Sequence, residues 1–376
     1  MEFQLSDLQR ELVEGVERYL RDAATPEAAR ASLDREPHGY DRELWRGLAS
    51  LGVTGLSIGE AYGGMGLGDL ELGFVAECAG RFLVRAPLGS TIWRSAAAIE
   101  LLGSEAQKEW WLPKIAAGDI AVAYVDVAAH AFAEPDVAGG RLTARFPVVA
   151  DAMAADLFVV VAPGGAWLIE AEDEGVARTA LETFDLLQPS ADVVLTGATA
   201  EPMGAAAEPM GAAAEPMGER DVRDAIRFLR QRAAVLTAFE QVGMCQAAID
   251  GAVAYAKERY AFGRAIGSFQ AVKHLLADMY VKMEIARSNS YYAGWALATR
   301  DANLTAAAAA AHLSATDALR HCAANAIQVH GGIGFTWELD CHLRYRRAHH
   351  LALQSGPARL WQDDLIDALA RQREAA

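Results

Sequence analysis

The sequence predicts an α+β protein with an N-terminal helical domain, a small middle β domain and a C-terminal helical bundle. Apolar residues recur at helical spacing in residues 1–120. Short β-branched runs replace that spacing in residues 121–220, and the helical pattern returns in residues 221–376. At 376 residues the chain is long enough for two or three structural units, so we expect these three segments to be its domains.

The N-terminal segment is predicted to be a set of helices separated by glycine and proline. Leu44, Leu48 and Leu51 show the spacing of one helical face. The opening residues are acidic from Glu2 onward and alternate polar with apolar positions, so we expect a first helix and not a secretory or transit peptide. Four glycines in residues 60–68 interrupt the pattern and predict a loop.

The middle segment is predicted to form strands, followed by a linker. Apolar runs at 121–127, 157–162 and 193–195 are bounded by Gly, Pro and Asp. The unit Ala-Glu-Pro-Met-Gly-Ala-Ala then starts at Ala200, is repeated from Ala207 and recurs in truncated form from Ala214. Each unit contains Pro and Gly, which break helices, so we expect a flexible linker or loop and not a coiled coil.

The C-terminal segment is predicted to be a bundle of long helices. The helical spacing of apolar residues continues nearly to the end of the chain. The expected helices cover residues 221–257, 269–300, 303–330 and 358–373.

Composition restricts the classes of partner. Hydrophobic residues make up 52% and charged residues 22% of the chain, and no apolar run is long enough to cross a bilayer. We therefore expect a soluble, cytoplasmic protein that does not enter membranes. The net charge of −16 opposes binding to nucleic acid, whose phosphates are neutralised by Lys and Arg. The four cysteines form no Cys-x-x-Cys pair, so we expect structural thiols and no metal site.

Three groups of motifs together resemble the acyl-CoA dehydrogenase family. Their order and spacing along an α-β-α chain make the combination specific, and the resemblance is weakest in the β segment. The motifs are Glu-Ala-Tyr-Gly-Gly-Met-Gly-Leu-Gly at 60–68 with 103–119, Arg-Tyr-Ala-Phe-Gly-Arg-Ala-Ile-Gly-Ser-Phe-Gln at 259–270, and Gln-Val-His-Gly-Gly-Ile-Gly-Phe-Thr at 328–336 with Arg346 and Arg347.

This resemblance implies α,β-dehydrogenation of an acyl-CoA thioester with FAD as cofactor. In the family a carboxylate removes the α-proton while a hydride leaves the β-carbon for the flavin, so base, thioester and flavin must meet in one site. An electron-transfer flavoprotein commonly takes the electrons.

The first group of implied cofactor contacts is Arg259, Phe262 and Gln270. In the family this stretch reaches across a dimer interface to the FAD of the neighbouring subunit. The resemblance implies that Arg259 pairs with the pyrophosphate, that Phe262 packs near the adenine and that Gln270 hydrogen-bonds the cofactor.

The second group is Gln328, Gly331 and Gly332. Adjacent glycines allow a backbone to approach a phosphate closely, although a glycine at a helix end is also an ordinary cap. His330 lies inside this motif, and we expect it to be structural.

The catalytic base of the family is missing from both of its known positions. The usual glutamate stands directly before Gly-Thr, and here Ser355 precedes Gly356 and Pro357. Some members carry the glutamate 13 residues before the glutamine that matches Gln246, and that position is Ala233. Pro357 also lacks the hydroxyl and the N–H of the usual threonine, and residues 123–130 lack the family's flavin-facing stretch.

These losses affect the contacts that a subunit makes to its own flavin, whereas the contacts that a subunit makes to the flavin of its neighbour are retained. We therefore expect a second acyl-CoA dehydrogenase-like subunit that supplies the carboxylate, in an α2β2 assembly. The chain resembles the partner-type subunits of actinobacterial heterotetrameric steroid side-chain acyl-CoA dehydrogenases, which makes a steroid-CoA thioester the substrate by analogy.

Three alternatives stay open from the sequence. A self-sufficient homo-oligomer would use a substitute base, for which Asp363, Asp364 and Glu240 are the candidates by sequence neighbourhood. A scaffold subunit would bind neither flavin nor CoA. A third class of relative would react its flavin with oxygen or a nitroalkane.

Overall fold

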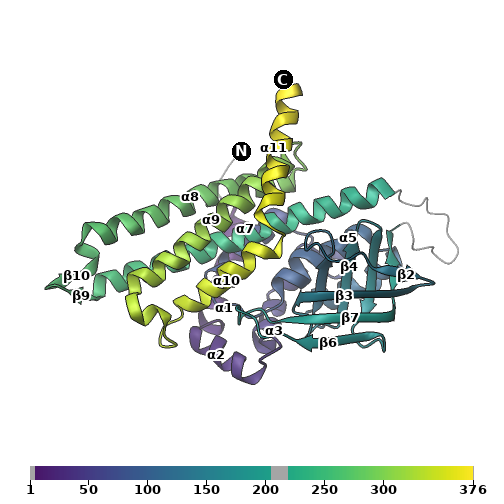
Figure 1. Ribbon diagram of the computed structural model, residues 1–376, viewed down its shortest axis with the longest axis horizontal. Helices are drawn as coiled ribbons and strands as arrows, with labels where there is room; N and C mark the ends of the chain where they lie inside the picture. The colour runs from purple at the N-terminus through teal and green to yellow at the C-terminus, as the bar shows by residue number, and fades with distance from the viewer. Residues whose placement is uncertain (1–4, 205–218, 376) are drawn as a thin grey trace.

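Helices and sheets occupy separate parts of the chain in the computed structural model, which describes residues 5–204 and 219–375 (Figure 1). The order is helical, then β, then helical, so the predicted α+β fold class is confirmed. The second and third copies of the seven-residue repeat fall mainly outside the described residues. The first copy corrects the loop prediction in part, because its Glu-Pro-Met forms strand β8 (Glu201–Met203).

The N-terminal helices begin with strong capping residues. Ser6 and Ser104 each form a capping box with the glutamine three residues later. Gly63 and Gly66 have φ of 79° and 64°, and they shape the predicted loop at 60–68. The helices are α1 (Asp7–Ala23), α2 (Pro26–Arg35), α3 (Arg42–Ser50), α4 (Asp69–Gly80), the π-helix η3 (Leu88–Ala96), α5 (Ala97–Leu102) and α6 (Glu105–Ala116).

Two four-stranded sheets form the β segment. One has the order β1-β4-β5-β8, with β1 parallel to β4, and the other is the antiparallel sheet β2-β3-β7-β6. Besides β8, the strands are β1 (Val122–Asp126), β2 (Asp136–Ala138), β3 (Arg141–Ala150), β4 (Leu157–Ala162), β5 (Gly165–Glu170), β6 (Val176–Ala180) and β7 (Ser190–Thr199).

Strand β4 is buried on both faces, which explains its unbroken apolar sequence. Phe158 and Val160 point into the core shared by the two sheets. Val159 and Val161 point the other way, into a core with α5, α6 and the first described turns of the next helix. The first sheet is therefore a middle layer between the second sheet and the helices.

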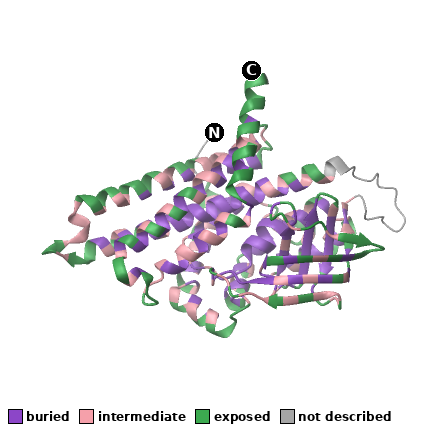
Figure 2. Ribbon diagram, viewed as in Figure 1, coloured by how far each residue is buried: buried purple, intermediate pink, exposed green. Residues whose placement is uncertain are grey.

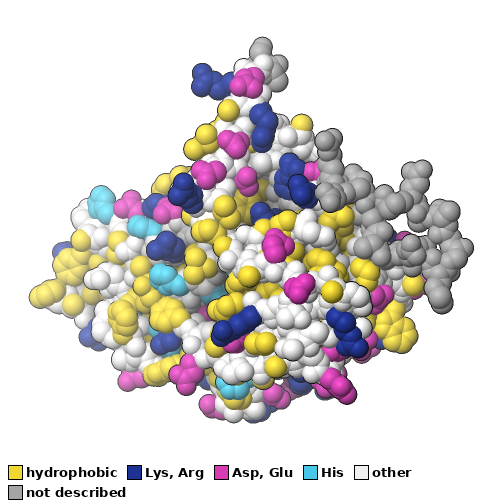
Figure 3. Space-filling model, turned by 45° about the vertical axis from the view of Figure 1, so that its right-hand side comes forward, with side chains coloured by type: hydrophobic (Ala, Val, Ile, Leu, Met, Phe, Trp, Pro, Cys, Tyr) yellow, Lys and Arg dark blue, Asp and Glu magenta, His cyan; other side chains and the backbone are white. Residues whose placement is uncertain are grey.

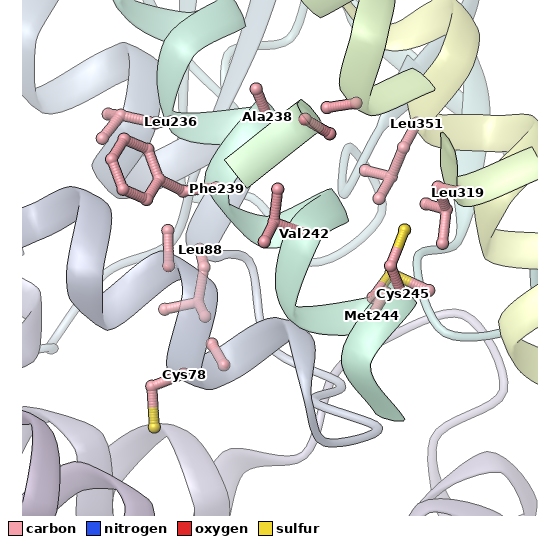
Figure 4. Close-up of a cluster of buried hydrophobic side chains, with 14 of the residues drawn as sticks. Cys78, Leu88, Leu236, Ala238, Phe239, Val242, Met244, Cys245, Leu319 and Leu351 are labelled. Atoms are coloured by element: carbon pink, nitrogen blue, oxygen red, sulfur yellow. The ribbon is translucent and has the colours of Figure 1, made fainter. Parts of the chain in front are cut away.

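The C-terminal bundle is built around one central helix, α7. The predicted helices are present with shifted ends, as α7 (Glu219–Glu258), α8 (Gln270–Ala298), α9 (Leu304–His330) and α11 (Ala358–Ala375). Side chains of α7 such as Phe239 and Val242 meet residues of α4, η3, α9 and a further helix (Figure 4). Figure 2 shows the buried residues concentrated along α7 and α9 and between the sheets, with more exposure on α8 and α11.

The further helix, α10 (Cys341–Gln354), is not among the sequence-predicted helices. Its sequence contains three arginines and three histidines and has a short apolar face. It packs against α9 and α7 through Leu351 and Ala348, and it carries the chain to Ser355.

Three general properties of the described residues bear on function. None of their helices combines the length and apolarity that crossing a bilayer demands. Cys78, Cys245 and Cys322 are buried thiols, Cys341 is half-buried, and all four are free. On the face shown in Figure 3, Lys and Arg side chains are interspersed with Asp and Glu.

Candidate functional site

The six sequence-predicted cofactor residues gather at one end of the bundle. α7 ends there, a hairpin of β9 (Tyr260–Ala261) and β10 (Arg264–Ala265) follows, and α8 starts at Gln270 (Figure 1). α9 ends at the same place and passes into the short helix η6 (Gly331–Phe335). The rings of Tyr255 and His330 join α7 to α9 with centroids 4.4 Å apart.

The polar side chains of this group are exposed and have no partners in the part of the chain that the structure describes. Arg259, Gln270 and Gln328 are exposed, and none of their side chains makes a hydrogen bond or ion pair with the residues that the structure describes. Phe262 is 95% exposed and has φ of 54°. Such a set of unused donors beside an exposed aromatic ring fits a pyrophosphate and an adenine.

The glycine pair leaves open space at its surface. Gly331 has φ of 67°, a conformation that L side chains rarely adopt, whereas no positive φ accompanies Gly332. A Cβ at either glycine would meet no atom within 4 Å. The Nδ1–H of His330 donates to the Ala326 carbonyl oxygen, 2.7 Å away, which agrees with the structural role expected from the sequence.

A second feature is a cavity of about 340 Å³ between the bundle and the sheets. It is bounded by η3, β1 with its following loop, β3, α7 and α10. Ser355 and Ala233, the two positions at which the expected base is missing, both line it and are both 4% exposed. The structure therefore brings the two vacant positions together at one place.

Ser355 is fixed as a hydrogen-bonding residue and not as a base. It follows the last residue of α10, and its carbonyl oxygen accepts from Trp361 Nε1 at 2.9 Å. Its hydroxyl accepts from the Arg94 guanidinium at 3.1 Å. Among the described residues, no side chain accepts a hydrogen bond from this hydroxyl, so none is placed to draw away its proton.

One carboxylate lines the cavity among the described residues, and it is already engaged. Asp126, at the end of β1, pairs with Arg230 through two 3.2 Å contacts. Its side chain also accepts from the Ala129 N–H at 2.9 Å. These bonds occupy both carboxylate oxygens and hold the side chain in one position.

The N–H groups of the loop after β1 are used in hydrogen bonds within the loop and to the end of β1. The N–H groups of Ala129 to Phe132 donate to Asp126 and to the backbone of residues 126–128. A flavin ring in this cavity would find these donors already used, so the loop fits such a ring poorly. The donor set that fits the cofactor is the one at the end of the bundle.

None of the three substitute bases considered from the sequence lines the cavity. Asp363 and Asp364 are exposed on α11. Glu240 is buried on α7, but its carboxylate accepts from Arg347 at 2.8 Å and from Trp93 at 3.4 Å. Closeness in sequence to the family motifs therefore did not identify carboxylates that line the cavity.

A buried polar network that sequence reasoning missed lies beside the cavity. Arg347 on α10 binds Glu240, Asp185 at 3.2 Å and Gln188 at 2.8 Å. Burial lowers the pKa of Arg347, but the two carboxylates outweigh burial and raise the pKa above its ordinary value. The side-chain amide of Gln188 also donates to the Asp151 carboxylate at 2.6 Å, which extends the network. The network ties the bundle to the β segment.

Comparison with known proteins finds relatives along almost the whole chain. The family model "Acyl-CoA dehydrogenase, N-terminal domain" matches residues 6–119, and "Acyl-CoA dehydrogenase, C-terminal domain" matches residues 222–366. Acyl-CoA dehydrogenase IpdE2 of Mycolicibacterium smegmatis is 33% identical over 353 residues, which are 93% of this chain and 96% of that protein.

Two solved structures extend this comparison. A chain of the ChsE4–ChsE5 complex from Mycobacterium tuberculosis superposes with a TM-score of 0.85 at 27% identity, covering 98% of this chain and 99% of that one. A chain of a variant of the Tcur3481–Tcur3483 steroid ACAD gives the same score, identity and coverage.

Proposed function

Because this chain belongs to the acyl-CoA dehydrogenase family, whose members are FAD-dependent oxidoreductases acting on CH–CH bonds, we propose that it is a subunit without a catalytic base. It completes the FAD site of a related partner subunit, which supplies the carboxylate. FAD, when bound, accepts the hydride that leaves the β-carbon of the acyl-CoA.

The observation that carries this proposal is the cavity that holds Ser355 and Ala233. Both positions lack a carboxylate, and Asp126 is held by Arg230. Abstraction of an α-proton requires a base within hydrogen-bond reach. Among the described residues, none of those that line the cavity is a free carboxylate, so we propose that the carboxylate base comes from another subunit.

Contacts at the end of the bundle support the second half of the proposal. Arg259, Gln270 and Gln328 project unpaired donors from one surface, and Gly331 with Gly332 leaves room for a phosphate. We propose that this chain binds the pyrophosphate and adenine end of the cofactor with these residues and with Phe262. Their role is to position the cofactor, and no proton moves through them.

The relatives support assembly with a different subunit. Two similar structures bear names of two-component assemblies, ChsE4–ChsE5 and Tcur3481–Tcur3483, and the latter is described as a steroid ACAD. We propose an α2β2 assembly, a steroid side-chain CoA thioester as the substrate and an electron-transfer flavoprotein as the acceptor.

Co-expression tests the proposal directly. This chain is produced with an acyl-CoA dehydrogenase encoded beside it and is purified by a tag on this chain alone. We expect a yellow complex with a one-to-one subunit ratio, and a colourless protein when the chain is produced alone. A yellow homo-oligomer that oxidises acyl-CoA without the partner would overturn the proposal, and steady oxygen consumption without an acyl-CoA would favour the oxidase-type alternative.

Gly332→Ala separates cofactor binding from folding. The new methyl group meets no atom of this chain and imposes no strained φ, so the stability of the isolated chain should not change. In the complex the methyl group stands where the phosphate approaches, and we expect a marked loss of FAD. The matched control is Gly15→Ala on α1, which is equally open and distant from the bundle end. Equal FAD contents in the two variants would support a scaffold role.

A further inference from the structure

Arg94 is a buried cation without a carboxylate partner. It lies on η3, is 6% exposed and lines the 340 Å³ cavity. It donates to the Gly89 carbonyl oxygen at 2.9 Å, to Ser355 at 3.1 Å and to Thr237 at 3.4 Å, all of which are neutral acceptors. A guanidinium has five N–H donors, so two have no protein acceptor among the described residues.

Other buried arginines of the described chain show how such a charge is normally compensated. Arg347 contacts two carboxylates, and Arg232 pairs with Asp69 at 2.7 Å. Arg85 binds the carbonyl oxygens of Ser32 and Glu36, which lie at the negative end of α2. Arg94 has neither kind of direct contact. The carboxylates of Glu240, Asp126 and Asp151 are near enough to favour its charge, but none of them bonds to it, and a buried charge is costly until it is paired.

Unsatisfied polar atoms accompany Arg94 in the lining of the same cavity. His350 Nε2, Gln354 Oε1 and Ser190 Oγ are buried and have no hydrogen-bond partner among residues 5–204 and 219–375. A Cβ at Gly89 would lie 3.4 Å from both Arg94 Nη1 and the Gln354 amide nitrogen, so these two head groups are neighbours. Buried polar atoms are nearly always paired in native proteins, and several left open at one cavity indicate a missing ligand.

The remaining lining is mainly apolar. It includes Phe132, Val148, Leu229, Ala233 and Leu353. An apolar cavity with a few convergent polar groups is the usual form of a small-molecule site. The free N–H donors of Arg94 suit an anion, and the paired Asp126–Arg230 adds no net charge.

We propose that this cavity binds a small carboxylate with a compact aliphatic or alicyclic body, its carboxylate held by Arg94 beside Gln354 and His350. The site is separate from the FAD contacts at the end of the bundle. The inference does not depend on the proposed partner subunit, because residues of this chain alone line the cavity.

The test is titration calorimetry on the purified full-length chain with cyclohexanecarboxylate as the probe. Cyclohexanecarboxamide, of similar shape but uncharged, is the matched control ligand. We expect saturable binding of the acid and binding of the amide that is weaker by about 10- to 100-fold, the difference made by one charge-assisted hydrogen-bonded contact. Equal binding of both ligands, or binding of neither, overturns the proposal.

Three variants locate the site. Arg94→Met should abolish the preference for the acid while leaving the melting temperature equal or higher, because it removes an uncompensated buried charge. Arg94→Lys should restore part of the preference. Ala233→Leu should fill the cavity and block both ligands, whereas the surface variant Arg21→Met should bind like the unaltered chain.

Whether the purified chain carries FAD distinguishes failure of this inference from failure of the assembly proposal. A chain that carries FAD in this cavity and excludes the probe overturns the inference and the assembly proposal together. Probe binding by a colourless chain that nevertheless forms no complex supports the inference and contradicts only the assembly proposal. Unchanged binding in Arg94→Met overturns the inference alone.

Discussion

At the scale of single residues, the described chain handles buried charge in two ways. Arg347 neutralises Glu240 and Asp185, whose side chains are 11% and 1% exposed, and the three groups stabilise one another. Arg94, 3.1 Å from the Ser355 hydroxyl, bonds to no carboxylate of the described chain, and we propose that it binds the carboxylate of a ligand. The two arginines should therefore respond oppositely to removal.

Arg347→Met should destabilise the fold strongly. It leaves two buried carboxylates without their cation, and breaking a buried pair in this way costs about 3 to 5 kcal/mol. Urea unfolding of the purified chain measures the loss. Arg346→Met on the same helix is the control, because Arg346 covers the Phe184 ring at 4.9 Å and donates to the Phe184 carbonyl oxygen at 3.3 Å, but pairs with no carboxylate among the described residues. Its loss should cost less than about 1 kcal/mol. Similar losses in the two variants would contradict this account.

Mild acid should destabilise the protein through His312. Its ring packs 5.0 Å from that of Trp361, both of its nitrogens lack partners, and burial, with a smaller effect of Arg94, lowers its pKa to about 4. The unfolded chain, with a histidine pKa of about 6.5, takes up the proton first. The stability is therefore complete above pH 6.5 and is lost as the pH falls toward 4.

The free energy of unfolding should drop by about 2 kcal/mol per buried histidine between pH 7 and pH 5. Denaturant unfolding across this range measures it. His312→Leu should flatten the profile, although His350, whose pKa is also lowered to about 4 by burial, keeps part of the slope. His38→Leu changes an exposed ring and should leave the slope as it is. A full slope in His312→Leu would contradict the assignment.

At the scale of elements, α4 and α7 touch through their backbones. A Cβ at Gly80 would lie 2.0 Å from the Glu240 carbonyl oxygen, and one at Gly243 would lie 1.9 Å from that of Glu77. Each of these two glycines faces the backbone of the other helix. This close approach lets Phe74 of α4 meet Phe239 of α7 edge-on at 6.0 Å.

Gly243→Ala should force the two helices apart and cost about 3 kcal/mol or more, as overpacking of a rigid core does. Gly251→Ala lies two turns later on α7, where a methyl group meets no atom within 4 Å. There the better helix propensity of alanine should stabilise the chain by about 0.5 to 1 kcal/mol. Thermal unfolding of both variants gives the comparison, and shifts of the same sign would refute the close contact.

The same scale shows what the sequence could and could not reveal. Long helices such as α8 and α9 repeat an apolar face many times, so their positions were predictable. Helix α10 was missed because its arginines and histidines, Arg347 among them, are buried by tertiary pairing that no local pattern records. Strand β3 was missed because bulges between its pairings with β7 disturb the alternation.

The candidate site divides in the same way. The residues at the end of the bundle come from two contiguous motifs, 259–270 and 328–332, whose spacing is visible in the sequence. The cavity is assembled from η3, β1, α7 and α10. Arg94 and Asp126 are single charged residues in apolar stretches, and only the fold brings them together.

At the scale of the whole molecule, the two sites lie in different surroundings. The cavity lies between the bundle and the sheets. The set around Arg259 projects from the far end of the bundle, where Tyr260, Phe335 and Trp337 are also exposed. Large exposed aromatic residues next to unpaired donors mark a surface that another molecule covers.

Assembly should therefore protect one site and leave the other unchanged. Amide hydrogen exchange of the isolated chain and of the co-expressed complex measures this. We expect residues 259–270 and 328–335 to exchange about tenfold or more slowly in the complex, because the cofactor and the partner cover their N–H groups. Residues 141–150 of β3, on the sheet away from this end, serve as the internal control. Slower exchange in β3 with none at 259–270 would place the partner on the β segment and refute the arrangement, since the unpaired donors at the end of the bundle would then face water in both states.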